Sequence, residues 1–166
     1  IGLCQLEQLE EQHKIRNENG AYLNEKLAAY PGIAPVKLHK GATAASYYIY
    51  AMVYNRDYFG GLPRERFIEA LKAEGVPVGT GYPNDPLYAQ PMLREVFGSD
   101  IYRKCYTADE LDFEKYKREN HCPALIKTYD SALWIWHGGL MLGSKSDMDD
   151  IVNAVDKIHN HAAKLK

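Results

Sequence analysis

Three cysteines, six histidines and one glycine-rich loop are the features of this sequence that could carry catalysis or metal binding. The cysteines are Cys4, Cys105 and Cys122. No two cysteines or histidines stand at the Cys-x2-Cys or His-x3-His spacing typical of zinc sites. His121 and Cys122 are adjacent, and His159 and His161 fall on different faces of a predicted helix. We therefore expect solvent-facing histidines and no metal site, while a Cys-His nucleophile pair stays open because its members meet only in space.

The loop from Gly138 to Ser146 looks like a phosphate-binding loop but has the wrong spacing. Ser144 follows Gly143 where such a loop has its lysine, and Lys145 comes one residue late. We interpret the segment as a strand-to-helix connection. Three carboxylates follow it, at Asp147, Asp149 and Asp150. The dipole at the start of a helix favours negative charge, which is a sufficient structural reason for them.

Two predicted strand ends are candidates for ligand contacts. In the first, residues 79–83, two glycines flank Thr80 and the segment ends in Tyr82-Pro83, so the backbone can approach another group closely. In the second, residues 134–139, a strand ends in His137 followed by two glycines. Ligand-binding loops and ordinary turns both fit these patterns.

Composition describes an ordinary globular chain. Its 166 residues are 46% hydrophobic and 25% charged, values typical of a packed domain. The formal charge of −2 does not indicate binding to nucleic acid or to a membrane surface. No apolar run approaches the ~18 residues of a membrane span. An odd number of scattered cysteines suits a reducing cytosol. The chain begins at Ile1 inside a predicted helix, so we expect a piece of a longer protein.

Hydrophobic spacing predicts the elements that hold these loops. Apolar residues three and four apart predict a helix from the first residues to about Tyr30. Its middle is polar at His13, Arg16 and Gly20, which fits either a solvated or kinked stretch or an interface with a missing partner. Residues 33–46 are predicted to be a loop.

The remainder predicts an α+β fold, with a few strands covered by helices. Alternation predicts a strand over residues 47–54, with Tyr48, Tyr50, Met52 and Tyr54 on one face. A helix from Pro63 to Gly75 and a short strand through Tyr82 complete an expected β-α-β unit. Residues 83–112 are predicted to be loop-like. The last elements are a helix over 123–129, a strand over 133–137 and a helix over 148–165, which Ser146 and Asp149 would cap.

Several segments resemble the DegT/DnrJ/EryC1/StrS family of pyridoxal-phosphate-dependent aminotransferases, which act mainly on keto-sugars and keto-cyclitols. The segments are, in chain order, residues 1–9, 19–27, 67–78, Gly81-Tyr82-Pro83 with Pro86-Leu87 and Gln90-Pro91, Cys122-Pro123-Ala124, Leu133-Trp134-Ile135 with His137, 140–143 and 147–158. The end of the chain is similar to the branch that contains glutamine:scyllo-inosose aminotransferases and 3-amino-5-hydroxybenzoate synthases. Gly81 and Tyr88 stand where many relatives have histidine, at positions near the substrate in the family.

The resemblance implies the C-terminal part of a fold type I enzyme. Residues 31–166 would form its α+β small domain, with a small mixed or antiparallel sheet, and residues 1–30 a long helix linking to a missing N-terminal large domain. The Schiff-base lysine and the phosphate-binding residues of the family precede the segment matched by Ile1, so none of the 13 lysines here is assigned that role. Pyridoxal phosphate would be bound mainly by the missing domain. Tyr82, Thr80 and His137 would line the substrate.

We therefore expect a cytoplasmic, homodimeric aminotransferase that moves an amino group from glutamate or glutamine to a keto-sugar or keto-cyclitol. Residues 1–166 alone are expected to be inactive, and no nucleic acid or membrane partner is expected. One alternative is a non-catalytic α+β interaction domain, such as a split or decayed aminotransferase piece. A self-contained hydrolase that uses Cys105 or Cys122 is a third hypothesis.

Overall fold

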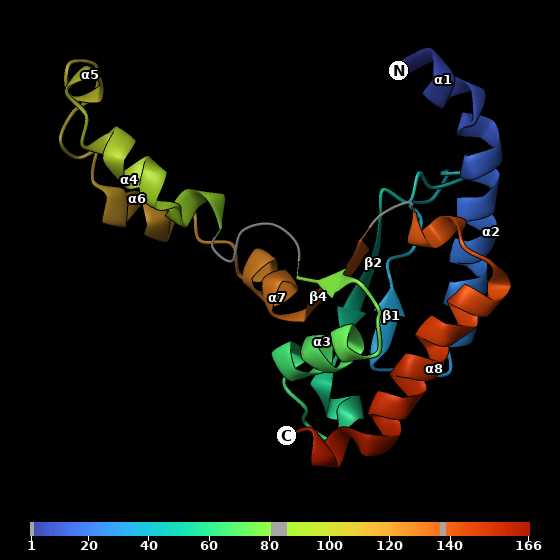
Figure 1. Cartoon of the computed structure of the whole chain (residues 1–166). Coiled ribbons are helices and arrows are strands. Elements are labelled where there is room, and N and C mark those ends of the chain that lie inside the picture. Colours follow the sequence, from blue (N-terminus) through green and yellow to red (C-terminus); the bar gives the residue numbers. More distant parts are fainter. Residues whose placement is uncertain (1, 81–85, 137–138) are drawn as a thin grey trace. The chain divides into compact units, whose positions relative to one another are not determined.

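A computed structural model of the chain describes residues 2–80, 86–136 and 139–166, without the side chain of Trp136. The chain divides into two compact units, of which unit 1 comprises residues 1–81 and 131–166 and unit 2 comprises residues 82–130. Figure 1 shows both units, with the elements labelled where there is room. Each unit has its own packing and is described by itself.

Unit 1 is built on a four-stranded antiparallel sheet. Its strands are β1 (Ile33–Pro35), β2 (Ile49–Tyr54), β4 (Ala132–Trp136) and β3 (Val78–Gly79), in the spatial order β1-β2-β4-β3. β2 and β3 each pair antiparallel with β4, so they run in the same direction with β4 between them. The expected β-α-β unit is therefore split, because α3 (Arg64–Ala73) connects two strands that do not pair with each other.

The alternation in β2 gives the sheet one buried face. Tyr50, Met52 and Tyr54 are buried, whereas Val53 is 43% exposed. Tyr50 pairs with Ile135 and Met52 with Leu133, so two strands present their apolar side chains to the same core. Tyr48 does not belong to this face: it precedes β2 and is 64% exposed.

Helices cover the buried face of the sheet. The predicted first helix is divided at Gln8 into α1 (Gly2–Glu7) and α2 (Leu9–Leu27), and α2 packs on β1 and on α8 (Lys145–His161) (Figure 1). α3 also packs on α8. The predicted apolar face of the last helix is confirmed by the buried side chains Met148, Ile151, Val155 and Ile158. Short 3-10 turns complete the unit at Arg56–Phe59, Leu140–Leu142 and Ala162–Lys164.

The loop predicted over residues 33–46 is wrong at its start. β1 occupies its first three residues and pairs with β2 through Ile33 and Tyr54. A three-residue edge strand that contains Pro35 has no pattern of its own, and its pairing with β2 defines it.

Unit 2 contains helices within residues 86–112, where a loop was predicted, and the helix predicted over residues 123–129 is confirmed. Its elements are the 3-10 turn η2 (Leu87–Ala89) and the helices α4 (Pro91–Phe97), α5 (Asp100–Arg103), α6 (Phe113–Glu119) and α7 (Pro123–Ser131). Proline is the first residue of α4 and of α7, a position that its fixed φ suits. The side chain of Ser99 caps α5 and that of Asp112 caps α6. Within the described ranges of the chain, no helix has the length and apolar character needed to cross a membrane.

Candidate functional site

The residues proposed from sequence to line a substrate fall at the ends of β3 and β4. Tyr82 and His137 lie outside the described residues. Thr80 follows β3 directly and is half-buried. Gly79 pairs with Trp134, while Trp136, two residues further along β4, pairs with Ile49. Because β3 and β4 are antiparallel, the chain leaves β3 at Gly79 and β4 at Trp136 in opposite directions along the strand axis.

A hollow that sequence reasoning missed opens beside the start of β2. It has a volume of about 290 Å³ and is lined by residues 36–39 and 45–51. Its polar lining includes Lys37, His39 and Ser46, and its aromatic lining includes Tyr47 and Tyr48. The hollow offers hydrogen-bond donors beside aromatic rings, which is the chemistry of a binding surface.

Tyr47 holds an unusual backbone conformation in this hollow. Its φ is 46°, in the left-handed region, which is rare for a bulky side chain. Its side chain packs against Gly20 of α2, where an added Cβ would lie 2.4 to 2.7 Å from two ring carbons and the hydroxyl oxygen. A helix-interior glycine costs about 1 kcal/mol relative to alanine, and the close approach of the Tyr47 ring accounts for its presence. Backbone strain of this kind is concentrated at functional sites.

Asn17 of α2 fixes the same segment by two hydrogen bonds to one residue. Its Nδ2 donates to the carbonyl of Ala45 at 2.9 Å, and the Ala45 N–H donates back to its Oδ1 at 3.0 Å. Residues 45–47 of the same chain therefore cover the polar middle of the first helix at Asn17 and Gly20. Composition alone did not indicate this partner, although a glycine and two asparagines in a helix interior were a usable signal.

A second polar contact joins α2 to the loop before α8. Asn19 is buried, with 3% of it exposed, and its Nδ2 donates to the carbonyls of Met141 and Gly143, each at 2.9 Å. Lys145 Nζ donates to Asn19 Oδ1 at 3.1 Å. Every polar atom of the Asn19 amide side chain thus has a partner, as a buried amide requires. The contact holds the segment from Gly139 onward against α2.

The start of α8 is capped two residues earlier than predicted. Ser144 is the N-cap, and its N–H and hydroxyl both donate to Asp147 Oδ2, at 2.6 and 2.8 Å. These hydrogen bonds lower the pKa of Asp147. The capping box is therefore Ser144 with Asp147, in place of Ser146 with Asp149.

Tyrosines around α2 act as hydrogen-bond donors at neutral pH. Burial raises the pKa of Tyr50, and its hydroxyl donates to Asn24 Oδ1 at 2.7 Å. Burial likewise raises the pKa of Tyr54 to about 12. The hydrogen bond from Tyr22 to Asp149 raises the pKa of that tyrosine. These groups can bind and orient, and they do not supply a base.

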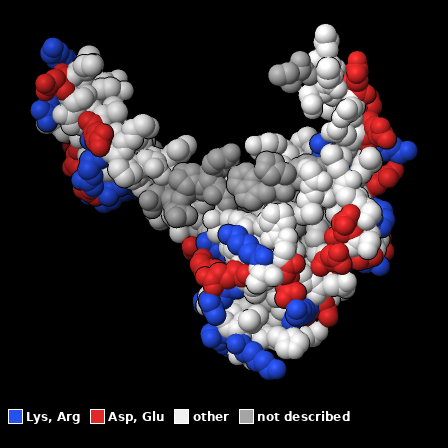
Figure 2. All heavy atoms as spheres, in the orientation of Figure 1, with Lys and Arg blue, Asp and Glu red and all other residues white. Residues whose placement is uncertain are grey.

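The remaining candidates for chemistry are dispersed. Cys4, Cys105 and Cys122 are exposed free thiols. No group of three or more metal-ligating side chains lies together among the described residues. On the face that Figure 2 shows, acidic and basic side chains are interspersed over the described atoms, in keeping with the net charge of −2.

Comparison with known proteins identifies relatives of nearly the whole chain. Residues 1–112 match the model of the DegT/DnrJ/EryC1/StrS aminotransferase family. An L-glutamine:2-deoxy-scyllo-inosose aminotransferase of Streptoalloteichus tenebrarius is 32% identical over 98% of this chain. The chain spans 37% of that relative's length.

Solved structures share the fold. The crystal structure of 3-amino-5-hydroxybenzoic acid synthase superposes on 92% of this chain with a TM-score of 0.57 and 21% identity, and the chain covers 36% of it. An Escherichia coli GDP-4-keto-6-deoxy-D-mannose-3-dehydratase with bound hydrated pyridoxal phosphate also has a TM-score of 0.57, at 16% identity, over 92% of this chain and 33% of that one.

Proposed function

Because the chain belongs to the DegT/DnrJ/EryC1/StrS aminotransferase family, we propose that it forms the C-terminal portion of a pyridoxal-phosphate-dependent aminotransferase. The observation that carries the proposal is the asymmetry of the match. One relative covers 98% of this chain, yet the chain spans only 37% of the relative. A domain of a larger enzyme has this relationship to its homologues.

The reaction we propose is amino transfer from glutamine or glutamate to a keto-cyclitol or keto-sugar. Glutamine and 2-deoxy-scyllo-inosose are named in the enzyme from S. tenebrarius, which is 32% identical. Gly81 and Tyr88 depart from the family pattern, so the ketone that is accepted is the part of the proposal that an assay must decide.

The lysines of this chain indicate which part of the enzyme would bind the cofactor. A lysine that forms a Schiff base must lose its charge at neutral pH, which requires a desolvated site. Each of the 13 lysines in the described chain is exposed or half-buried. The pKa of Lys115 changes in the opposite direction, because its hydrogen bond to Asp109 raises that pKa. The described residues therefore do not fit pyridoxal phosphate by themselves, and the lysine that binds it would come from the rest of the enzyme.

We propose that residues 1–30 form the linking helix and residues 31–166 the small domain. α1 has no buried residue, and Leu3 and Leu6 are 79% and 63% exposed. Further along, Leu23 and Leu27 of α2 are fully buried in the core of unit 1. The helix is thus anchored at its C-terminal end and presents apolar side chains at its start. We propose that the whole protein is a cytoplasmic homodimer whose substrate site includes Thr80, Tyr82 and His137.

The test is an assay of the protein encoded by the complete reading frame. Purified enzyme is supplied with pyridoxal phosphate, glutamine labelled with ¹⁵N at its α-amino group, and 2-deoxy-scyllo-inosose. Mass spectrometry of an aminated cyclitol that carries ¹⁵N is the expected result. A reading frame that encodes only these 166 residues, with no amino transfer to any keto-cyclitol or keto-sugar tried, would favour the non-catalytic interaction domain.

A further inference from the structure

Unit 2 contains a second hollow, which the proposed function does not use. It has a volume of about 450 Å³, within the range of small-molecule sites. It lies between α4, α5 and the start of α6. Its lining includes Arg94, Phe97, Arg103, Tyr106, Leu111 and Phe113.

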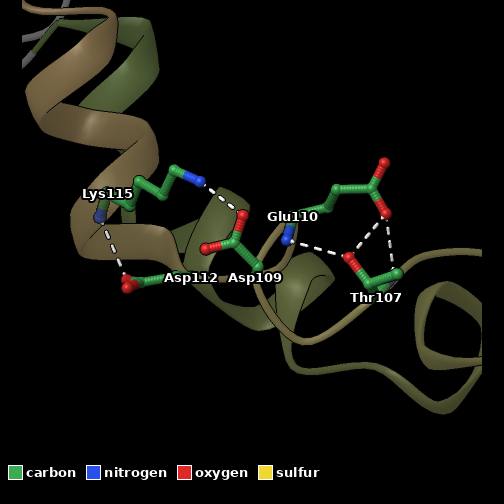
Figure 3. Close-up of polar contacts among 5 residues, drawn as sticks. All are labelled: Thr107, Asp109, Glu110, Asp112 and Lys115. Atoms are coloured by element: carbon green, nitrogen blue, oxygen red, sulfur yellow. Dashed lines mark hydrogen bonds and ion pairs between the residues drawn. The ribbon is translucent and has the colours of Figure 1, made fainter.

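Local hydrogen bonds shape one wall of this hollow. Ala108 and Leu111 belong to the connection between α5 and α6, which Figure 3 shows in close-up. Thr107 Oγ1 donates to Glu110 Oε2 at 2.8 Å, and the Thr107 N–H donates to the same oxygen at 2.8 Å. These bonds, which lower the pKa of Glu110, close the turn around Ala108.

The next turn is held in the same way. Lys115 Nζ donates to Asp109 Oδ2 at 2.5 Å, and Asp112 Oδ1 accepts from the Lys115 N–H at 3.0 Å (Figure 3). The Asp112 cap starts α6 and thereby places Phe113, which is only 8% exposed, at the base of the hollow. Phe97 packs edge-to-face on the Phe113 ring at 5.6 Å between centroids.

The charged groups in the lining are both cationic. Arg94 lies over the Phe113 ring at 4.8 Å and is oriented by Glu114 at 2.6 Å. Arg103 contacts Asp100 at 3.5 Å, with 64% and 90% of the two side chains exposed. An exposed pair of this kind contributes little and exchanges readily, so the guanidinium of Arg103 can turn its planar donor edge to another anion.

We propose that this hollow binds a compact organic anion with a flat apolar body. Its carboxylate would pair with Arg103, and its body would lie against the aromatic surfaces of Tyr106 and Phe97. Guanidinium groups suit a carboxylate because two parallel N–H donors match its two oxygens. The aromatic walls add apolar contact that an inorganic anion could not use.

The test uses benzoate and its uncharged analogue benzyl alcohol, titrated into the whole ¹⁵N-labelled chain at constant ionic strength. Benzoate is expected to shift the amide signals of Phe97, Tyr106 and Leu111, and benzyl alcohol is expected to bind at least about fivefold more weakly. Arg103→Ala should weaken benzoate binding about fivefold or more, because the charged hydrogen bonds are lost. Lys104→Ala is the matched control, because it removes the same charge from the neighbouring residue, which does not line the hollow.

Three results would overturn the proposal. One is equal binding of benzoate and benzyl alcohol. Another is an equal effect of the Arg103 and Lys104 substitutions, which would indicate net charge alone. The third is the absence of shifts around the hollow. Tyr106→Ala, a substitution of a half-exposed side chain, provides an independent variant and should also weaken binding while signals from unit 1 stay unchanged. The proposal does not depend on the aminotransferase assignment.

Discussion

The ring of Tyr47 occupies the space that a side chain at Gly20 would fill. Two ring carbons and the hydroxyl oxygen lie 2.4 to 2.7 Å from the position of a Cβ on that glycine. The contact joins a strained residue in the connection before β2 to the middle of α2. It is therefore the contact that most directly positions the hollow beside the start of β2.

Gly20→Ala should destabilise unit 1 even though alanine favours helix. The gain in helix propensity is about 1 kcal/mol, whereas forcing a ring out of a packed position costs about 1–3 kcal/mol. We expect a lower urea midpoint with an unchanged slope. Gly2→Ala is the control, since nothing lies within 4 Å of its added Cβ. A Gly20→Ala protein as stable as wild type would contradict the packing described.

Asn17→Ala should lower the free energy of unfolding by about 1–2 kcal/mol, because both hydrogen bonds to Ala45 are lost. Asn153→Ala, on the exposed side of α8, makes the same chemical change outside this contact and should have a small effect. Chemical denaturation of the two variants checks the difference. Hydrogen exchange at the Ala45 amide should also rise in the Asn17 variant alone.

Two serine substitutions distinguish the observed cap of α8 from the one predicted from sequence. Ser144→Ala should cost about 1 kcal/mol because it removes the N-cap side chain. Ser146→Ala, inside the helix, should be neutral or slightly stabilising. Thermal unfolding of both proteins measures the comparison, and the reverse ranking would restore the predicted cap at Ser146.

The cap should also depend on pH in a defined direction. The pKa of Asp147 is lowered in the folded state by the Ser144 hydrogen bonds, so its ionised form stabilises the fold above the ordinary aspartate value of about 4. This contribution is lost as the pH falls through that value toward the lowered pKa. Asp147→Asn should therefore be destabilising at pH 7 and nearly neutral at pH 2. Asp150→Asn changes the same charge nearby without touching the cap, and its effect should not follow this profile.

Strong periodicity was enough to predict part of unit 1. The buried alternation of Tyr50 with Met52 and the apolar face of α8 are both confirmed. Each of these patterns runs over several residues and fits one periodicity, that of a strand for the first and that of a helix for the second. The family resemblance, which rested on the order of many short segments, is confirmed by the family match.

Some of the errors arise from contacts between residues distant in the chain. β1 exists because Ile33 pairs with Tyr54, and the burial of Gly20 depends on Tyr47. In unit 2 the helices α4 to α6 are too short for a periodic signal, and local caps such as Ser99 and Asp112 define them. Those two capping residues were visible in the sequence and could have been used to predict α5 and α6.

The candidate substrate residues remain predictions. Thr80 follows β3, and Trp136 ends the described part of β4, which runs in the opposite direction. Substituting Thr80→Val in the complete enzyme should raise the KM for the ketone and leave cofactor content unchanged. An unchanged KM would remove Thr80 from the substrate site.

The most direct test of the account is a cofactor titration that compares residues 1–166 with the protein from the complete reading frame. The account predicts that the complete protein retains about one pyridoxal phosphate per chain after gel filtration, by absorbance, and that residues 1–166 retain none. Stoichiometric retention by residues 1–166, lost on substitution of one of their lysines, would contradict it.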